Sequence, residues 1–341
     1  LVVGDRIASS SAITHFSPLD QIVGTGQVDP SQFYKAVLAT GRREGRQFLL
    51  PVSFDLPMML YNQTSAAAGA ASNSITIAQM RQESLDFQKK STSDFRIVGF
   101  SPLWNPSFLV QAAALAGADF HQTTRGNLAW DEQKLQAGIS SMRDWVGKVD
   151  GGADSEASFR ERYLYDPVYK LLSTGRILYY YMPASQFAQL PQDKRGSIRF
   201  KWLSENGQIH ALENVEYVGV PNRARDKGAA YAFLQWFFQP SNQTRMLDAS
   251  RFEQLKSFGI SGGFSALHVV NERDFPQYYP ELLGKIPSAA SLAFPKSLPT
   301  DWTDLETNVL VPWLEHEIAI PAADQRLDDR LKAWRLQKPL Q

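Results

Sequence analysis

The chain has 341 residues, of which 43% are hydrophobic and 21% charged, a balance typical of a globular protein large enough for two lobes. Lysine plus arginine and aspartate plus glutamate number 35 each, so no overall charge attracts the chain to nucleic acid or to an anionic membrane. The absence of cysteine excludes disulfides, thiolate catalysis and cysteine-ligated metals, and no apolar run approaches the roughly 18 residues of a membrane helix.

Strands and helices alternate along the chain, which indicates an α/β protein with mainly parallel sheets. The apolar start Leu1-Val2-Val3 reads as the end of a buried strand. Further strands are predicted at residues 95–100, 176–182, 199–202 and 215–221. Helices are predicted at 29–38, 74–88, 108–116, 131–146, 164–172, 227–239, 276–286, 304–317 and 324–334. In the helix at 227–239, the apolar spacing places Trp236 in the core.

Residues 49–62, LLPVSFDLPMMLYN, form the stretch around which the chain is organised. Pro51 and Pro57 bias the residues before them to an extended conformation, so two short extended segments are expected here. Asp55 is the one acid among apolar neighbours, and burying it costs free energy unless it is hydrogen-bonded. Two interpretations follow. Asp55 either caps a turn or faces water at a strand end, or it lines a ligand cleft between two lobes.

This stretch resembles the first interdomain crossover of the solute-binding proteins of ABC importers, family 1, the maltose- and multiple-sugar-binding type. Other segments resemble the family in the same order over nearly the whole chain. They are VVGDRI, GFSPLWNPSFLVQAAALAGADF, LLSTGRILYYYMPASQF, EYVGVPNRARDKGAAYAFLQWFFQPSNQ and SLPTDWTDLETNVLVPWL. The YYYMPASQF segment and the alanine-rich loop at 65–71 depart from the family pattern.

The resemblance implies a two-lobed periplasmic-binding-protein fold of type II, with a sheet flanked by helices in each lobe and a multi-strand hinge. It divides the chain into lobe 1 at 1–57, lobe 2 at 58–218, lobe 1 again at 219–293, and a crossover with the last lobe 2 helices at 294–341. It also implies that about 60 residues precede residue 1, since a βαβ unit has about 30. An export signal, and a lipid anchor, would lie there.

The implied function is the capture of a mono- or oligosaccharide in the cleft and its delivery to ABC permease subunits. The protein would be a monomer located in the periplasm or otherwise outside the cytoplasm. No catalytic residue, metal or cofactor is expected, and no nucleic-acid partner.

A sugar site needs polar groups for hydroxyls and aromatic planes for C–H faces. The loops that resemble the family's binding loops carry such groups. The ligand-binding residues expected from them are Asp5, Arg6, Ser53, Asp55, Trp104, Asn105, Ser185, Gln186, Gly263, Phe264, Ser265 and Trp302. Asp5 and Asp55 would accept hydroxyl protons, and Trp104 and Trp302 would stack on ring faces. The plainer interpretations are a surface ion pair for Asp5 with Arg6 and core or hinge packing for the two tryptophans.

Other ligands and activities stay open. A glycerophosphate or another polar non-sugar could use Arg6 and the glycine turn at Gly262–Gly263. An iron or polyamine carrier is disfavoured. A metal-binding carrier would need clusters of tyrosine and histidine, and residues 179–181 are the only such cluster in the sequence. Since adjacent strand residues alternate faces, at most Tyr179 and Tyr181 point together. A carbohydrate-acting enzyme could use a carboxylate pair such as Asp5 and Asp55. The five histidines are scattered, His316 lacks a helical metal-binding partner, and no nucleophile, phosphate-loop or dinucleotide motif is present.

Overall fold

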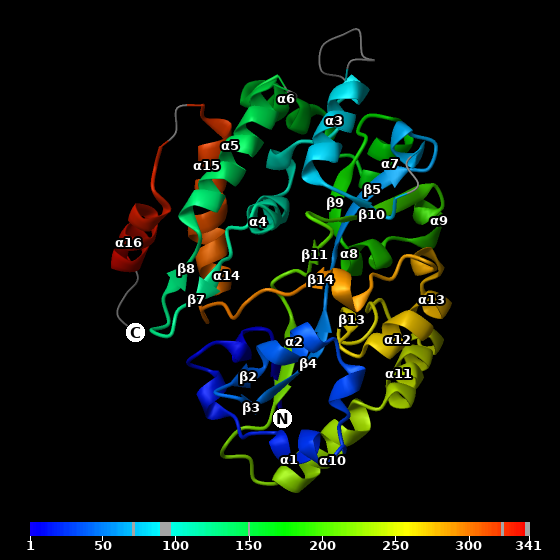
Figure 1. Cartoon of the computed structure of the whole chain (residues 1–341). Coiled ribbons are helices and arrows are strands. Elements are labelled where there is room, and N and C mark those ends of the chain that lie inside the picture. The colour runs from blue at the N-terminus through cyan, green and yellow to red at the C-terminus, as the bar shows by residue number, and fades with distance from the viewer. Residues whose placement is uncertain (70–71, 89–96, 149–150, 322–323, 338–341) are drawn as a thin grey trace.

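The computed structural model describes residues 1–69, 72–88, 97–148, 151–321 and 324–337, and its elements group around two sheets (Figure 1). The lower half in that view holds a sheet with strand order β1-β12-β4-β13, and the upper half holds one with order β6-β10-β5-β9. The strands are β1 (Val2–Gly4), β12 (Glu216–Gly219), β4 (Leu49–Phe54), β13 (Phe264–Ser265), β6 (Ser74–Ile75), β10 (Ile198–Leu203), β5 (Pro57–Asn62) and β9 (Tyr180–Pro183).

Helices flank both sheets. Those of the first half are α1 (Asp20–Gly24), α2 (Lys35–Thr40), α10 (Lys227–Phe237), α11 (Pro240–Phe252), α12 (His268–Arg273) and α13 (Phe275–Tyr278). Those of the second half are α3 (Ile77–Gln88), α4 (Pro106–Leu115), α5 (Glu132–Lys148), α6 (Ala153–Tyr163), α7 (Val168–Ser173), α8 (Ala184–Gln189), α9 (Gln192–Arg195), α14 (Trp302–Leu305), α15 (Val311–Ala319) and α16 (Leu327–Gln337). This arrangement confirms the α/β, two-lobed fold class expected from the sequence.

The expected strand direction is wrong for the described ladders. Every pair in the first sheet is antiparallel, and in the second only β10 with β6 is parallel. The reason lies in the crossovers. β4 ends in the first sheet and continues as β5 in the second after only Asp55 and Leu56. The chain later returns from the second half and enters the first sheet as β12, which runs opposite to β4 and pairs with it in antiparallel.

Two further connections cross between the halves in the middle of the molecule (Figure 1). β11 (Ile209–His210) pairs in parallel with β14 (Leu292–Ala293), beside the passage from β4 to β5. Two small antiparallel hairpins complete the strands, β2 (Arg42–Arg43) with β3 (Arg46–Gln47) and β7 (His121–Gln122) with β8 (Leu128–Ala129).

Several element predictions need correction. The strand expected at 95–100 lies partly outside the described residues, and within them Val98 forms a single parallel bridge with Ile177. Trp236 is 47% exposed rather than core, because α10 buries Ala230, Leu234 and Phe237, one residue away from the face expected. The helix expected at 304–317 is α14 and α15 separated by a π-helical turn, Glu306–Leu310.

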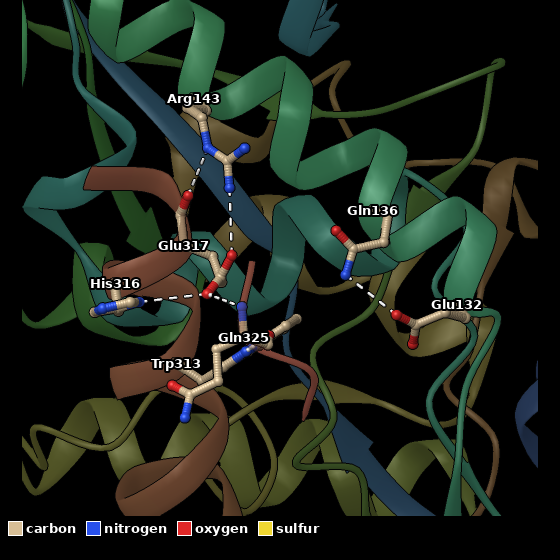
Figure 2. A network of polar contacts seen from close by, with 7 residues as sticks. All are labelled: Glu132, Gln136, Arg143, Trp313, His316, Glu317 and Gln325. Atoms are coloured by element: carbon tan, nitrogen blue, oxygen red, sulfur yellow. Dashed lines mark hydrogen bonds and ion pairs between the residues drawn. The ribbon is translucent and has the colours of Figure 1, made fainter. Parts of the chain in front are cut away.

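A buried ion pair ties α5 to α15 and to the chain before α16 (Figure 2). Glu317 is 2% exposed, and its carboxylate lies 3.3 Å from Nη2 of Arg143 and accepts a bond from the backbone N–H of Gln325 at 3.0 Å. Nε of Arg143 donates to the Glu317 carbonyl at 2.7 Å, and the Trp313 indole donates to the Gln325 carbonyl at 2.6 Å. The buried carboxylate is therefore matched by donors from two other segments, as a charge in a low-dielectric interior requires.

Candidate functional site

The end of β1 brings an ion pair to the space between the two halves. Nε of Arg6 lies 3.2 Å from the carboxylate of Asp5, and Nη1 of Arg6 donates to the backbone carbonyl of Glu213 at 3.1 Å. Glu213 lies on the return connection between β11 and β12. The loop after β1 is thereby held against a segment that crosses between the halves.

A cavity of about 330 Å³ lies beside this contact, in the size range of small-ligand pockets. Its walls come from α4, from residues 117–120 before β7, from the crossing segments at 210–213 and 293–298, and from the start of α14. The polar and aromatic residues that line it are Gln111, Asp119, Phe120, His210, Glu213, Phe294, Lys296 and Trp302. A narrower hollow lined by Asp5 and Arg6 shares Glu213 and Lys296 with it, so the Asp5–Arg6 pair borders the same space.

Carboxylates outnumber free cations around this space. Lys296 is paired with Asp119 at 2.6 Å, and Arg6 is paired with Asp5. Within the described part of the chain, the Glu213 carboxylate has no hydrogen bond or ion pair, since Arg6 contacts only the Glu213 backbone carbonyl. Burial and, after it, the negative charge of Glu213 raise the pKa of Glu306 to about 7, against the lowering effect of Arg6. Glu306 and Glu213 are thus close enough to repel each other.

Tyr181 is a buried donor close to the same carboxylates, although it does not line the cavity. Its side chain is 1% exposed, and its hydroxyl has no hydrogen-bond partner among the described residues. Burial raises its pKa, and the charges of Glu213, Asp55 and Glu306 raise it further. The phenol therefore stays protonated. His210 also stays neutral, because burial lowers its pKa.

Asp55 lies in the crossover, as expected, but its carboxylate is engaged inside the protein. It is 3% exposed and accepts bonds from the backbone N–H of Leu56 at 2.8 Å, from the N–H of Ser185 at 3.2 Å and from the Ser185 hydroxyl at 2.5 Å. Burial still dominates and raises its pKa to about 6, against the lowering effect of these bonds. These bonds tie the crossover to Ser185 in the first turn of α8, and a role of Asp55 as a ligand contact stays a prediction. Gln186, beside it, is exposed.

The other strand residues of the expected site lie within the first sheet. Ser53 is 2% exposed and pairs with Ser265 on β13. Ser265 itself is fully buried and donates to the Gln243 side chain at 2.6 Å. Gly263 and Phe264 are buried next to Phe54, and a β-carbon at Gly263 would lie 2.5 Å from the Phe54 carbonyl oxygen. These four residues pack the sheet edge, and their role as ligand contacts stays a prediction.

Trp104 and Asn105 lie in lobe 2, at the entry to α4. Trp104 stacks on Phe159 with ring centroids 5.4 Å apart and planes inclined by 15°. The Asn105 side chain caps α4 by accepting bonds from the N–H groups of Ser107 and Phe108 at 3.0 and 3.3 Å. Neither residue borders the cavity that holds Glu213, and a ligand role for them also stays a prediction.

Of the twelve expected residues, the structure therefore brings Asp5, Arg6 and Trp302 around one space. Sequence reasoning missed Glu213, Glu306 and Tyr181. A signal existed for Glu306, which follows Trp302 by four residues and so lies one helical turn on. No local pattern marked Glu213, which reads as one acid in a polar turn.

Two further observations concern metal binding and membrane spans. Among the described residues, no three histidine or acidic side chains are placed to hold a metal ion. In the same part of the chain, no helix is long and apolar enough to cross a membrane.

No protein-family model and no curated protein matches this sequence. Solved structures do match. The sugar-binding protein MalE from Xanthomonas citri has 13% identity and a TM-score of 0.69, and the match covers 98% of this chain and 81% of that one. The maltose-binding periplasmic protein MalE from Listeria monocytogenes, in complex with maltose, has 13% identity and a TM-score of 0.68, over 100% of this chain and 84% of that one.

UgpB from Mycobacterium tuberculosis, in complex with glycerophosphocholine, matches with 14% identity and a TM-score of 0.59, over 98% of this chain and 82% of that one. These likenesses extend over nearly the whole chain at low identity. The chain therefore has the two-lobed fold shared by these sugar- and solute-binding proteins.

Proposed function

We propose that this chain is the solute-binding component of an ABC importer, which captures a carbohydrate between its two halves and delivers it to a membrane permease. The observation that carries the proposal is the cavity of about 330 Å³ beside the crossing segments, in a fold shared with a protein solved in complex with maltose. The Glu213 carboxylate, the Gln111 amide and the His210 imidazole are suited to hydroxyls. Phe120 and Trp302, which pack on each other and are 8% and 1% exposed, form part of the apolar wall.

Charge favours a sugar over the alternative ligand, a glycerophosphate. An anion would meet Glu213, Glu306 and Asp5, while the nearby cations Arg6 and Lys296 are already paired. Neutral hydroxyls instead can donate to the Glu213 carboxylate, which lines the cavity. The enzymatic alternative is weakened for the pair considered from the sequence, because the Asp55 carboxylate is bound by internal donors.

In this proposal the lobes are the two halves built on the two sheets, close to the division expected from the sequence except that β12, Glu216–Gly219, belongs with the first sheet. They close by bending at the three crossings, at 55–56, 211–215 and 294–301, which is a hinge motion. The ligand shifts the population toward the closed form, which the permease recognises. The protein would act outside the cytoplasm, as a monomer.

The test is a calorimetric titration of the purified chain with a panel of mono- and oligosaccharides, maltose among them, and with glycerophosphocholine. We expect a saccharide to bind. Glu213→Gln should weaken that binding about tenfold or more, since a hydrogen bond to a charged group is worth about 1.5–3 kcal/mol. The matched control Glu161→Gln, on the exposed face of α6, should bind like the wild type.

Three outcomes would contradict the proposal. They are binding of glycerophosphocholine in place of every sugar, equal binding by the Glu213→Gln variant, and chemical conversion of the sugar during the titration. The last would favour an enzyme.

A further inference from the structure

A second hollow, of about 840 Å³, lies away from the site described above. One wall is formed by α9 and β10 of the second sheet, and the other by the end of α11 and the segment from Gln277 to Lys285. α9 and α13 are neighbours in Figure 1, on the side of the crossing strands opposite α14 and β7. The hollow therefore joins the two halves on the other side of the molecule from Glu213 and Trp302.

Positive charge is concentrated in this hollow. Its cationic lining residues are Arg195, Arg199, Arg251, Lys256 and Lys285, and its acidic lining residue is Glu281. Glu281 is already paired with Arg195 at 3.0 Å. This excess stands out in a chain whose lysines and arginines equal its acids in number, 35 each.

Four of these cations have no carboxylate partner in the described part of the chain. Arg199 donates through Nη1 to the carbonyls of Gly196 and Ile198, at 3.0 and 2.9 Å, which leaves the other guanidinium donors available. The side chains of Arg251, in the last turn of α11, and of Lys256, beyond its end at Phe252, show neither an ion pair nor a hydrogen bond among the described residues. Both are exposed, so they can reach a ligand in the hollow.

Lys285 is repelled by the neighbouring positive charges. Its ammonium donates to the Phe200 carbonyl at 3.0 Å and lies 4.3 Å from the centre of the Phe200 ring. Burial lowers its pKa, and the charges of Arg199 and Lys201 lower it further. An anion in the hollow would relieve this repulsion, because opposite charge favours the protonated ammonium.

We propose that this hollow is a second binding site, which takes a small multivalent oxyanion such as a phosphorylated solute. A concave site lined by several cations attracts anions. Guanidinium groups match phosphate oxygens with paired donors, and Lys256 and Lys285 add point charges. Ser250, Ser257 and Gln254 add polar groups for the remaining oxygens. Since its walls come from both halves, a bound anion would bridge them. The inference does not depend on the proposed sugar binding.

The experiment is a calorimetric titration of the full chain with inorganic pyrophosphate at constant ionic strength, with potassium chloride as the blank. The wild type should bind one pyrophosphate per chain. The double variant Arg199→Gln with Lys256→Gln should bind at least tenfold more weakly. The matched control, Lys332→Gln with Arg335→Gln on the exposed part of α16, removes the same charge and should bind like the wild type. Thermal melts of each variant confirm that it folds.

A third variant, Arg6→Gln, separates this site from the cleft. It should retain pyrophosphate binding. Loss of binding in Arg6→Gln but not in the double variant would place the anion in the cleft and overturn the inference. Equal weakening by both double variants would overturn it as well. So would the absence of any heat of binding by the wild type at up to about 1 mM pyrophosphate, a Kd that corresponds to only about −4 kcal/mol.

Discussion

Replacing Asp55 by asparagine should change how the stability of this protein depends on pH. The folded-state pKa of Asp55 is raised from its ordinary value of 3.8 to about 6, because burial outweighs the bonds from Ser185 and Leu56. The folded protein therefore binds this proton more tightly than the unfolded chain. The contribution of Asp55 to stability is complete below about pH 4 and is lost as the pH rises to about 6. At about 1.4 kcal/mol per pKa unit, the loss is about 3 kcal/mol.

Asparagine keeps the geometry and cannot ionise. Its oxygen can accept the two backbone bonds, and its amide can donate to the Ser185 hydroxyl. Urea unfolding of both proteins at pH 4 and pH 7.5 gives the comparison. The free energy of unfolding of Asp55→Asn minus that of the wild type should rise by about 3 kcal/mol between the two pH values. Other carboxyl groups titrate in both proteins and cancel.

Asp193→Asn, at an exposed aspartate, is the matched control and should not reproduce that rise. Parallel curves for Asp55→Asn and wild type would refute the reasoning. They would mean that the internal bonds fully offset burial, so that the buried carboxylate costs nothing at neutral pH.

Three stability predictions follow from other buried contacts. Arg143→Met should lower the free energy of unfolding by about 3–5 kcal/mol in urea titrations, because it leaves the Glu317 carboxylate buried without its cation; an unchanged midpoint would show that the remaining donors suffice. Gly263→Ala should cost about 1–3 kcal/mol, seen as a lower Tm, because its β-carbon would meet the Phe54 carbonyl; an unchanged Tm would mean that the strand edge yields freely. Trp104→Ala should cost about 3–5 kcal/mol by losing its stack on α6, and a loss below about 1 kcal/mol would contradict packing as its main role.

The architecture followed from the sequence because it depends on local patterns. Prolines at 51 and 57 around an alternating apolar run fixed an extended crossover, and β4 and β5 occupy the expected places. Strand direction did not follow, since it depends on which segments cross between the halves. Trp236 was misplaced because several aromatic residues follow one another in α10, and a shift by one residue selects a different buried face.

The site was harder to predict because polar side chains form hydrogen bonds inside the protein, and some of their partners lie far away in the sequence. Asp55 and Asn105 have the composition of ligand contacts, yet one binds Ser185, 130 residues on, and the other caps its own helix. A polar residue in a loop after a strand is equally suited to either use. Only the three-dimensional arrangement shows which of its hydrogen-bonding atoms remain available.

Three side chains near the crossings share a position that the sequence does not reveal. Glu213, Glu306 and Tyr181 come from three separate segments, and each lies next to the crossings between the halves. Two neighbouring carboxylates repel each other, and the buried, unpartnered Tyr181 phenol leaves bonding capacity unused, so both arrangements cost free energy in the unliganded protein. A ligand that supplies hydroxyls removes that cost only while both halves enclose it. If the proposed solute binds there, the repulsion between Glu213 and Glu306 would help to provide the difference in affinity between open and closed forms that a hinge motion requires.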